Sequence, residues 1–359
     1  MTLLVSGDLG TRTGGYGYDR EILAGLARLG WTTSICALDA SFPAPTADAR
    51  AQAARALAAL PDDALVLADG LAFGVLDREA ASEAARLRFV GLVHHPLALE
   101  NGVPADRVPA LVASERRALA CTRGVVVTSH ATVTSLAPYA VPADRVAVVL
   151  PGTPELPIAR GSRGRDAART DAPVALLSVA TLTPRKGHDV LIAALARLAH
   201  LPWQLTLAGS VTMHPPTTTA LREAIDVHGL ADRVTFAGDL DEDALRAAYD
   251  AADVFVLPTR HEGYGMAIAE AVAAGLPVVA TPTGAIPALV DDASGVLVPI
   301  DDVDALTTAL SRVIGDDDAR TALAAGAVRR RDTLPRWADS AIAMDDALRR
   351  FAANGIVQR

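Results

Sequence analysis

The residues best suited to chemistry lie in one segment of the second half of the chain, Leu257-Pro-Thr-Arg-His-Glu-Gly-Tyr-Gly-Met-Ala-Ile-Ala-Glu270. An apolar run typical of a buried strand ends where this segment begins, and a helical pattern starts near Met266. Between them, Gly263, Tyr264 and Gly265 predict a tight turn. Backbone N–H groups at such a helix start are ready to bind an anion such as phosphate.

Two carboxylates flank this helix start, Glu262 in the turn and Glu270 two turns into the helix. Both are expected to line the edge of the sheet at which open α/β sheets bind their ligands. The alternative is a solvated helix face with a glutamate near its N-terminus. The ordered sequence of strand, turn, glycine pair, helix and second glutamate favours a ligand site over that alternative.

A second candidate is the segment Thr181-Leu-Thr-Pro-Arg-Lys-Gly-His188, which joins a predicted strand to a predicted helix. Lys186 is the single lysine among 33 lysine and arginine residues. A compact ammonium at a strand-to-helix turn suits contact with phosphates, and Arg185 stands beside it. The alternative is a stray surface lysine. In either case we expect Lys186 to be exposed and to contribute little to the core.

The Gly-rich segment Gly7-Asp-Leu-Gly-Thr-Arg-Thr-Gly-Gly-Tyr-Gly17 follows the first predicted strand. Its spacing is not G-x-G-x-x-G, and no convincing acidic partner follows the second strand, which disfavours a dinucleotide site. Taken alone, Gly14 and Gly15 are a weak signal. A mobile turn would have the same composition.

A fourth candidate, Val93-His94-His95-Pro96, lies at the end of a predicted strand. Adjacent side chains on an extended chain point in opposite directions and no third ligand is apparent, so we predict no metal here. A core histidine bonded to backbone is the alternative for His94. The Asp239-Leu-Asp241 pair mimics a metal-binding motif, but Asp241 is better interpreted as the N-cap of a helix over Glu242–Ala251.

These candidates require two series of alternating strands and helices. Short apolar runs without alternation are typical of parallel strands buried on both faces. The first series predicts strands at Leu3–Ser6, Thr33–Ala37, Ala64–Ala68, Phe89–Val93, Gly124–Thr128 and Val146–Leu150. The second predicts strands at Ala175–Val179, Gln204–Ala208, Arg233–Phe236, Val254–Leu257, Pro277–Ala280 and Gly295–Val298. Among the helical patterns between the strands is one over Tyr18–Leu29. This alternation of strands and helices therefore predicts two doubly wound α/β sheets.

The predicted domains are 1–155 and 174–335, joined by a linker over 156–173. Proline, glycine and arginine dominate the linker, and its arginines (Arg160, Arg163, Arg165 and Arg169) suit a solvated segment better than an anion-binding surface. The segment 336–359 contains a helical pattern that could fold back on the first domain.

Composition narrows the choice of partners. The chain has 359 residues, 51% of them hydrophobic and 4% aromatic, and a formal net charge of −9. An acidic, aromatic-poor protein is a poor match for nucleic acid. We interpret Cys36 and Cys121 as buried free thiols. The start of the chain lacks a basic, signal-like region and the longest apolar runs are too short to span a bilayer, so we expect a cytoplasmic protein, at most peripheral to a membrane.

The segment with Glu262 and Glu270 resembles the E-x7-E signature of retaining glycosyltransferase family 4. The resemblance is clear over about 174–300 and weaker over the first domain. It implies a GT-B fold of two Rossmann-like domains facing across a cleft, with a nucleoside-diphosphate-sugar donor on the second. It also implies a hexosyl transfer without metal or other cofactor to a small-molecule, glycan or lipid-linked acceptor.

The resemblance also implies roles for the candidate residues. Glu270 would hold the donor ribose and Glu262 the hydroxyls of the transferred sugar. Arg185 and Lys186 would neutralise the diphosphate, while His94 and the amides of Gly14 and Gly15 would approach the sugar and phosphates. The turn residues that complete the donor site would be Gly263, Tyr264, Gly265 and Met266.

Two departures from the family pattern stand out. Many members have Gly-Arg after the first strand of the second domain, where this chain has Ala180-Thr181. An acidic residue often stands near the position of Ala288. The same fold also serves nucleotide-sugar 2-epimerases, sugar phosphorylases and non-catalytic nucleotide-sugar-binding subunits, which stay as alternatives.

Overall fold

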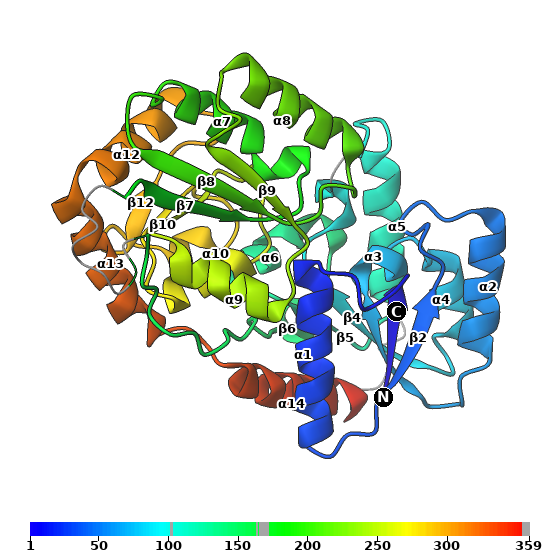
Figure 1. Cartoon of the computed structure of the whole chain (residues 1–359). Coiled ribbons are helices and arrows are strands. Elements are labelled where there is room, and N and C mark those ends of the chain that lie inside the picture. Colours follow the sequence, from blue (N-terminus) through cyan, green and yellow to red (C-terminus); the bar gives the residue numbers. More distant parts are fainter. Residues whose placement is uncertain (101–102, 163, 165–171, 354–359) are drawn as a thin grey trace. The chain divides into compact units, whose positions relative to one another are not determined.

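Apolar strand sequences account for most of the architecture. The computed structural model describes residues 1–353 except 101–102, 163 and 165–171. Contacts divide the chain into two units, Met1–Gly152 with the segment that begins at Pro335, and Thr153–Leu334. Each unit has a six-stranded sheet in which the paired strands are all parallel, covered by helices (Figure 1).

The first unit has the strand order β2-β1-β3-β4-β5-β6. Its strands are β1 Thr2–Ser6, β2 Ser34–Leu38, β3 Leu65–Asp69, β4 Arg88–Val93, β5 Gly124–Val127 and β6 Val146–Val148. Its helices are α1 Gly14–Arg28, α2 Ala47–Ala58, α3 Gly70–Phe73, α4 Asp77–Glu83, η1 Leu97–Leu99, α5 Val108–Ala120, α6 His130–Ser135, η2 Ala137–Tyr139, η3 Ala143–Arg145 and α14 Trp337–Ala353.

The second unit has the strand order β12-β11-β10-β7-β8-β9. Its strands are β7 Val174–Val179, β8 Trp203–Ala208, β9 Val234–Gly238, β10 Val254–Leu257, β11 Val278–Ala280 and β12 Gly295–Leu297. Its helices are η4 Pro184–Lys186, α7 His188–Ala196, α8 Pro215–Val227, α9 Glu242–Ala251, α10 Met266–Ala273, α11 Ile286–Leu289, α12 Val303–Gly315 and α13 Asp317–Arg331.

Every strand predicted from the sequence is present, with boundaries shifted by at most two residues. The first helix differs from its prediction, because α1 begins at Gly14 rather than Tyr18. Thr13 has extended backbone and its side chain accepts a hydrogen bond from the Tyr16 amide, which caps the helix. Gly14 and Gly15 therefore form the first turn of a helix and not a loop.

Helix α14 packs against α1 within the first unit. Trp31 Nε1 donates to Asp345 at 2.6 Å, and Ser340 Oγ donates to the Leu150 carbonyl at 2.7 Å. Phe351 is fully buried and lies where a Cβ on Gly124 would be, within 2.4 Å of its ring. The C-terminal helix thus completes the core of the N-terminal sheet.

The described part of the predicted linker is held by the second unit. Arg160 pairs with Asp250, and its amide and that of Gly161 donate to the Asp250 carbonyl at 2.9 Å. Arg160 itself stays exposed, with 54% of its side chain accessible, as expected for a solvated segment. The predictions for Arg163, Arg165 and Arg169 lie outside the described residues.

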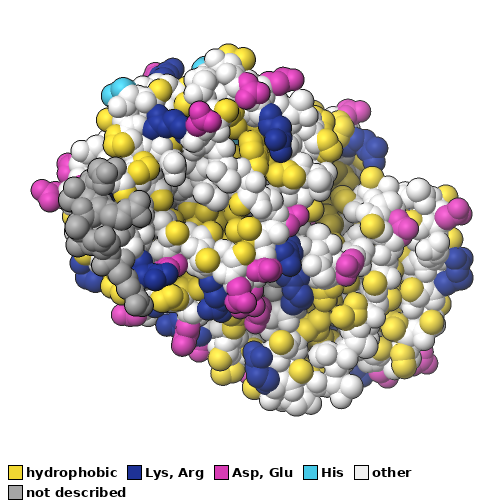
Figure 2. Space-filling view, viewed as in Figure 1, with side chains coloured by type: hydrophobic (Ala, Val, Ile, Leu, Met, Phe, Trp, Pro, Cys, Tyr) yellow, Lys and Arg dark blue, Asp and Glu magenta, His cyan; other side chains and the backbone are white. Residues whose placement is uncertain are grey.

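Over the described ranges, no helix combines the length and the apolarity needed to cross a membrane. On the face drawn in Figure 2, acidic and basic side chains are interspersed among apolar groups. A basic stripe of the kind that follows a nucleic-acid backbone is not visible among the described residues of that face.

Strand order also determines where ligands are expected. In a doubly wound sheet, the chain leaves two adjacent strands in opposite directions at the switch point, and a crevice opens there at their carboxyl ends. The switch point lies between β1 and β3 in the first unit and between β7 and β10 in the second. The predicted site residues follow β1, β4, β7 and β10.

Candidate active site

In the second unit, the switch point brings together the η4 turn and the loop between β10 and α10. Lys186 Nζ forms an ion pair with Glu262 Oε1, and Arg185 Nη1 lies 3.8 Å from Glu262 Oε2. All three side chains are largely buried, with 14% of Lys186, 17% of Arg185 and 9% of Glu262 exposed. The sequence prediction of an exposed Lys186 is therefore wrong, because its ammonium turns inward to a buried carboxylate.

Close backbone packing holds these two loops together. Gly187 has φ 69°, and a Cβ there would lie 2.0 Å from the Pro258 carbonyl oxygen, so only glycine fits. The Arg185 carbonyl accepts from the Arg260 amide at 2.7 Å, and the Arg185 guanidinium donates to the His261 carbonyl at 2.7 Å. The lysine turn is thus fixed against the loop that contains Glu262.

Arg260 is part of this clamp and was not predicted from the sequence. Its guanidinium pairs with Asp189 at the start of α7 and with Asp301, both at 2.7 Å, and donates to the Pro184 carbonyl. The side chain therefore ties η4, α7 and the loop after β12 to the end of β10. Nothing in the local sequence distinguishes Arg260 from the other arginines.

The electrostatics of Glu262 depend on its two cationic neighbours. Burial alone would raise the pKa of this carboxyl group. The charges of Lys186 and Arg185 outweigh that effect and hold the Glu262 pKa below its usual range. Glu262 is therefore ionised near neutral pH and accepts hydrogen bonds, which excludes it as a general acid.

The start of α10 is suited to an anion. Gly265 occupies the N-cap position with φ 96° and no side chain caps the helix. The Ile268 amide donates to the Gly265 carbonyl at 3.0 Å, and the amides of Met266 and Ala267 before it have no carbonyl acceptor within the helix. Gly263 precedes Tyr264, which is 6% exposed, and burial raises the Tyr264 pKa to about 12. These amides and the cations of η4 follow adjacent strands of one sheet.

Glu270 lies in the second turn of α10 and has one direct partner that the sequence did not reveal. Tyr249, on α9, donates its hydroxyl to Glu270 Oε2 at 2.9 Å. Burial raises the pKa of Glu270 to about 7, and the Tyr249 hydrogen bond offsets only part of that rise. Oε2 accepts the Tyr249 hydrogen bond, and the other oxygen, Oε1, suits a ligand hydroxyl. The sequence around Tyr249 does not indicate this contact, since it shows only one aromatic residue on an amphipathic helix.

In the first unit, the structure brings the glycine pair next to His94. A Cβ on Gly15 would lie 3.4 Å from His94 Cδ2, so glycine at this position permits close approach of the helix start to the ring. The first-turn amides at Gly14 and Gly15 have no carbonyl acceptor within α1. His94 itself is partly exposed, with 19% of its side chain accessible.

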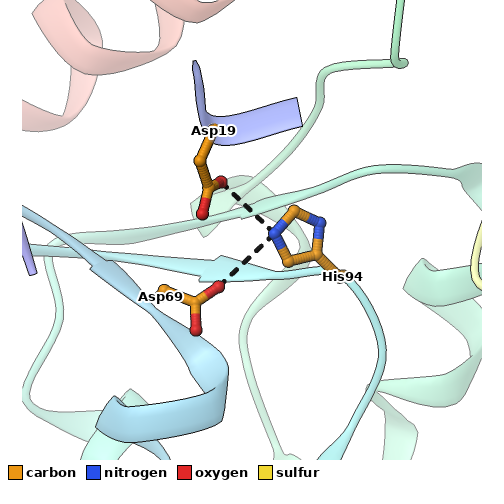
Figure 3. A group of neighbouring side chains, drawn as sticks. All are labelled: Asp19, Asp69 and His94. Carbon is orange, nitrogen blue, oxygen red and sulfur yellow. Dashed lines mark ion pairs between the residues drawn. The ribbon is translucent and has the colours of Figure 1, made fainter. Parts of the chain in front are cut away.

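Two buried carboxylates face the same nitrogen of His94 (Figure 3). Asp19 Oδ1 lies 3.3 Å and Asp69 Oδ2 3.4 Å from His94 Nε2. The sequence prediction that His94 has no third potential ligand nearby is therefore wrong: the topology places β1, β3 and β4 side by side and adds Asp19 from α1. His95 points elsewhere and pairs with Glu100 at 2.8 Å.

Asp69 could have been found from the sequence, because it is a polar residue at the carboxyl end of a buried strand. Asp19 was harder to identify from the sequence, because it lies one helical turn after Gly15 on a helix whose start was predicted too late. The interpretation of Asp241 is confirmed: its side chain accepts from the Ala244 amide at 2.8 Å and caps α9, Glu242–Ala251.

The two units each present an open parallel sheet with polar groups at the carboxyl edge of its switch point, which is the arrangement of the GT-B class. Solved structures agree with this fold. The sucrose-phosphate synthase of Thermosynechococcus elongatus has a TM-score of 0.82 at 21% identity, covering 98% of this chain and 100% of that one. Anabaena HepE in complex with UDP-glucose has a TM-score of 0.75 at 18% identity, covering 98% and 100%.

Comparison with known proteins supports the resemblance to glycosyltransferase family 4. Residues 173–316 match the sequence model described as glycosyl transferases group 1. A D-inositol 3-phosphate glycosyltransferase of Xylanimonas cellulosilytica is 34% identical over 220 residues, which are 58% of this chain and 52% of the relative.

A second relative is a GDP-mannose-dependent α-(1-6)-phosphatidylinositol monomannoside mannosyltransferase of Mycolicibacterium smegmatis. It is 38% identical over 175 residues, which are 46% of this chain and 44% of the relative. The chain spans about half the length of these curated relatives.

Proposed function

We propose that the protein is a retaining hexosyltransferase that moves a sugar from a nucleoside-diphosphate-sugar to an acceptor without a metal ion. The observation that carries the proposal is the Lys186–Glu262–Arg185 cluster beside the uncapped start of α10. A single switch point there offers cations and amides for a diphosphate and an ionised carboxylate for sugar hydroxyls. The match of residues 173–316, which include this cluster, to the group 1 glycosyltransferases supports the assignment.

In the proposed reaction, Glu270 accepts hydrogen bonds from the donor ribose. Lys186, Arg185 and the α10 amides hold the diphosphate, and Glu262 binds hydroxyls of the sugar. The bond between the anomeric carbon and the phosphate oxygen breaks as the acceptor oxygen bonds to the same face of that carbon. The leaving phosphate takes the proton of the acceptor hydroxyl. Charge that develops on the phosphate is stabilised by groups already in place.

Arg185 is a suitable substitute for the arginine that many family members place at the position of Thr181. Its Nε is buried and makes no hydrogen bond to the described residues, while Nη1 anchors the side chain on the His261 carbonyl. A buried donor of that kind is costly without an acceptor, and a phosphate oxygen would supply one. On the first unit, His94 and the amides of Gly14 and Gly15 are proposed to bind the substrates.

A thermal-shift panel of nucleoside-diphosphate-sugars tests the proposal. A donor present at 100 times its Kd should stabilise the protein by about 2.7 kcal/mol. GDP-mannose and UDP-glucose come first because of the relatives' names, and inositol phosphate and phosphatidylinositol mannoside are the first acceptors. Conversion of the donor without acceptor would indicate an epimerase, and replacement of the nucleotide by free phosphate a phosphorylase. Binding without turnover across the acceptors would indicate a non-catalytic subunit.

We predict that turnover persists after treatment with a chelator. The cations of Lys186 and Arg185 and the α10 amides supply the positive field that a metal gives in other transferases. The measurement is the initial rate before and after EDTA and after adding back magnesium or manganese. Loss of activity that either ion restores would contradict metal independence.

We predict that Glu270→Gln weakens nucleotide-sugar binding, because charge-assisted hydrogen bonds to the ribose are worth roughly 1.5–3 kcal/mol each. The wild-type affinity should also depend on pH. The Glu270 pKa is about 7, so the carboxylate form dominates above that pH and is lost below it. Apparent Kd should then rise by up to about tenfold per pH unit as the pH falls below 7, because the competent fraction falls.

Calorimetry between pH 5.5 and 8.5 with an intact nucleotide-sugar checks both effects, because its diphosphate diester does not change charge in this range. Glu270→Gln should bind weakly at every pH. Glu223→Gln, on the exposed side of α8, is the matched control and should behave as wild type. Unchanged affinity in Glu270→Gln would remove the residue from the ribose site.

A further inference from the structure

The cluster of Asp19, Asp69 and His94 comes from three elements of the first unit, and Figure 3 shows both carboxylates directed at one ring nitrogen. The separations of 3.3 and 3.4 Å to Nε2 exceed the roughly 2.7–2.9 Å of a directed charge-assisted hydrogen bond. The second ring nitrogen, Nδ1, lies on the side of the ring away from both carboxylates.

Charge balance in this cluster depends on the imidazole. The Asp19 side chain is fully buried, and neither of its oxygens accepts a hydrogen bond from the described residues. The guanidinium of neighbouring Arg20 donates instead to the carbonyls of Leu9 and Thr11, at 2.6 and 3.1 Å. Asp69 uses Oδ1 to accept from the Leu71 amide at 2.9 Å, which leaves Oδ2 toward His94.

The other titratable groups around His94 are tyrosines that stay neutral. Tyr18 packs its ring edge-on against His94 at 5.3 Å and donates its hydroxyl to the Val149 carbonyl. Tyr16 donates to the Ser6 carbonyl at 2.6 Å. Burial and the nearby carboxylates raise the pKa of Tyr16 to about 12 and that of Tyr18 well above its ordinary value. Neither can neutralise Asp19 or Asp69.

We propose that Asp19 and Asp69 are positioning residues that hold His94 in its doubly protonated form, with Nε2–H between the carboxylates and Nδ1–H left to donate to a substrate oxygen. His94 then acts as a fixed cation and hydrogen-bond donor, and not as a base. The role of His94 as a hydrogen-bond donor in the reaction rests on the proposed function. Burial alone would lower the His94 pKa, but the two carboxylates raise it to about 10.

The proposal restricts the route of the reaction's proton. A neutral imidazole with its proton on Nε2 would have a lone pair on Nδ1, which could take the hydroxyl proton of the acceptor substrate. An imidazolium has no lone pair to offer. The proton released as the new glycosidic bond forms must then go to the leaving phosphate, which agrees with the proposed same-face displacement.

Imidazole NMR of the full chain tests this without any substrate. Signals of His94 are assigned from their loss in His94→Gln, and both ring nitrogens are followed from pH 5 to 10. The wild-type ring should remain doubly protonated beyond pH 8. In Asp19→Asn and in Asp69→Asn, its pKa should fall by about 1–3 units, the usual effect of one neighbouring opposite charge. Asp77→Asn, a buried carboxylate paired with Arg117, is the control and should leave His94 unchanged.

Activity gives a second readout. With the substrates identified as above, turnover by Asp19→Asn and Asp69→Asn should fall as the pH rises through the lowered His94 pKa and recover at lower pH. A merely structural role would depress turnover equally at every pH and overturn the proposal. A wild-type His94 ring that is neutral at pH 7 would also overturn the proposal. A change in the ring nitrogen shifts on adding zinc or magnesium alone would overturn it in favour of a cation site. Absence of transferase activity would leave the NMR result unaffected.

Discussion

Lys186→Ala is expected to lower kcat/KM at least about 100-fold, the scale of removing one electrostatic stabiliser from a transferring group. Negative charge grows on the leaving phosphate as the glycosidic bond breaks, so the ammonium interacts more strongly with the transition state than with the bound donor. The loss should therefore fall largely on kcat. Steady-state kinetics with the best donor measure it, and Arg197→Ala, an exposed cation paired with Asp304, is the control.

Lys186→Arg should recover only part of this activity. The turn before Gly187 packs against Pro258 too closely to move, and a longer planar guanidinium cannot occupy the position of the ammonium. Folding is affected as well, because the alanine variant leaves the buried Glu262 with Arg185 alone. We expect a loss of stability below the roughly 3–5 kcal/mol seen when a buried charge loses its pair, since one cation remains. Near-normal turnover by a folded Lys186→Ala protein would exclude this residue from the phosphate site.

Glu262→Gln is expected to depress kcat by about 100-fold or more while nucleoside-diphosphate affinity is unchanged or slightly tighter. The amide keeps the shape of the side chain but loses the charge that binds sugar hydroxyls in the proposed reaction. It also releases Lys186 and Arg185 from their carboxylate partner, so their charge is more available to the diphosphate.

Turnover kinetics and calorimetry with the free diphosphate separate the two effects. Combining Glu262→Gln with Lys186→Ala completes a double-mutant cycle, in which residues that touch should show non-additive effects. A large loss of diphosphate affinity with normal kcat would place Glu262 at the nucleotide instead of the sugar.

The strands could be predicted because parallel strands buried on both faces are continuous apolar runs, and β10 was predicted to the residue. The Lys186 and Glu262 loops could be predicted as neighbours for a related reason, since carboxyl ends of strands meet at one edge. The direct ion pair between Lys186 and Glu262 could not be predicted, because the direction of the side chains depends on the close packing of Gly187 against Pro258.

The His94 cluster shows where sequence reasoning ends. Asp69 ends β3 and His94 follows β4, and these two strands are neighbours in the sheet. Asp19 reaches them from α1, whose start was predicted four residues too late. The error came from treating Gly14 and Gly15 as a loop, since glycine has low helix propensity. The Thr13 cap, which is a local interaction, and the tight approach of Gly15 to His94, which is a tertiary one, outweigh that propensity. Tyr249 was missed because its hydrogen bond to Glu270 is also a tertiary interaction.

The ion pair between Lys186 and Glu262 also bears on selectivity among anions. A carboxylate of the protein already occupies the ammonium that a phosphate would bind, so any incoming anion must displace an internal competitor. Inorganic phosphate or sulfate brings no hydrogen-bond donors to the carboxylate it displaces, which would stay buried without compensation. In the proposed reaction, a nucleotide-sugar would deliver the phosphate and the sugar hydroxyls together, and those hydroxyls would bind Glu262 as Lys186 leaves it. The resting pair would then discriminate against abundant small anions while admitting the larger ligand.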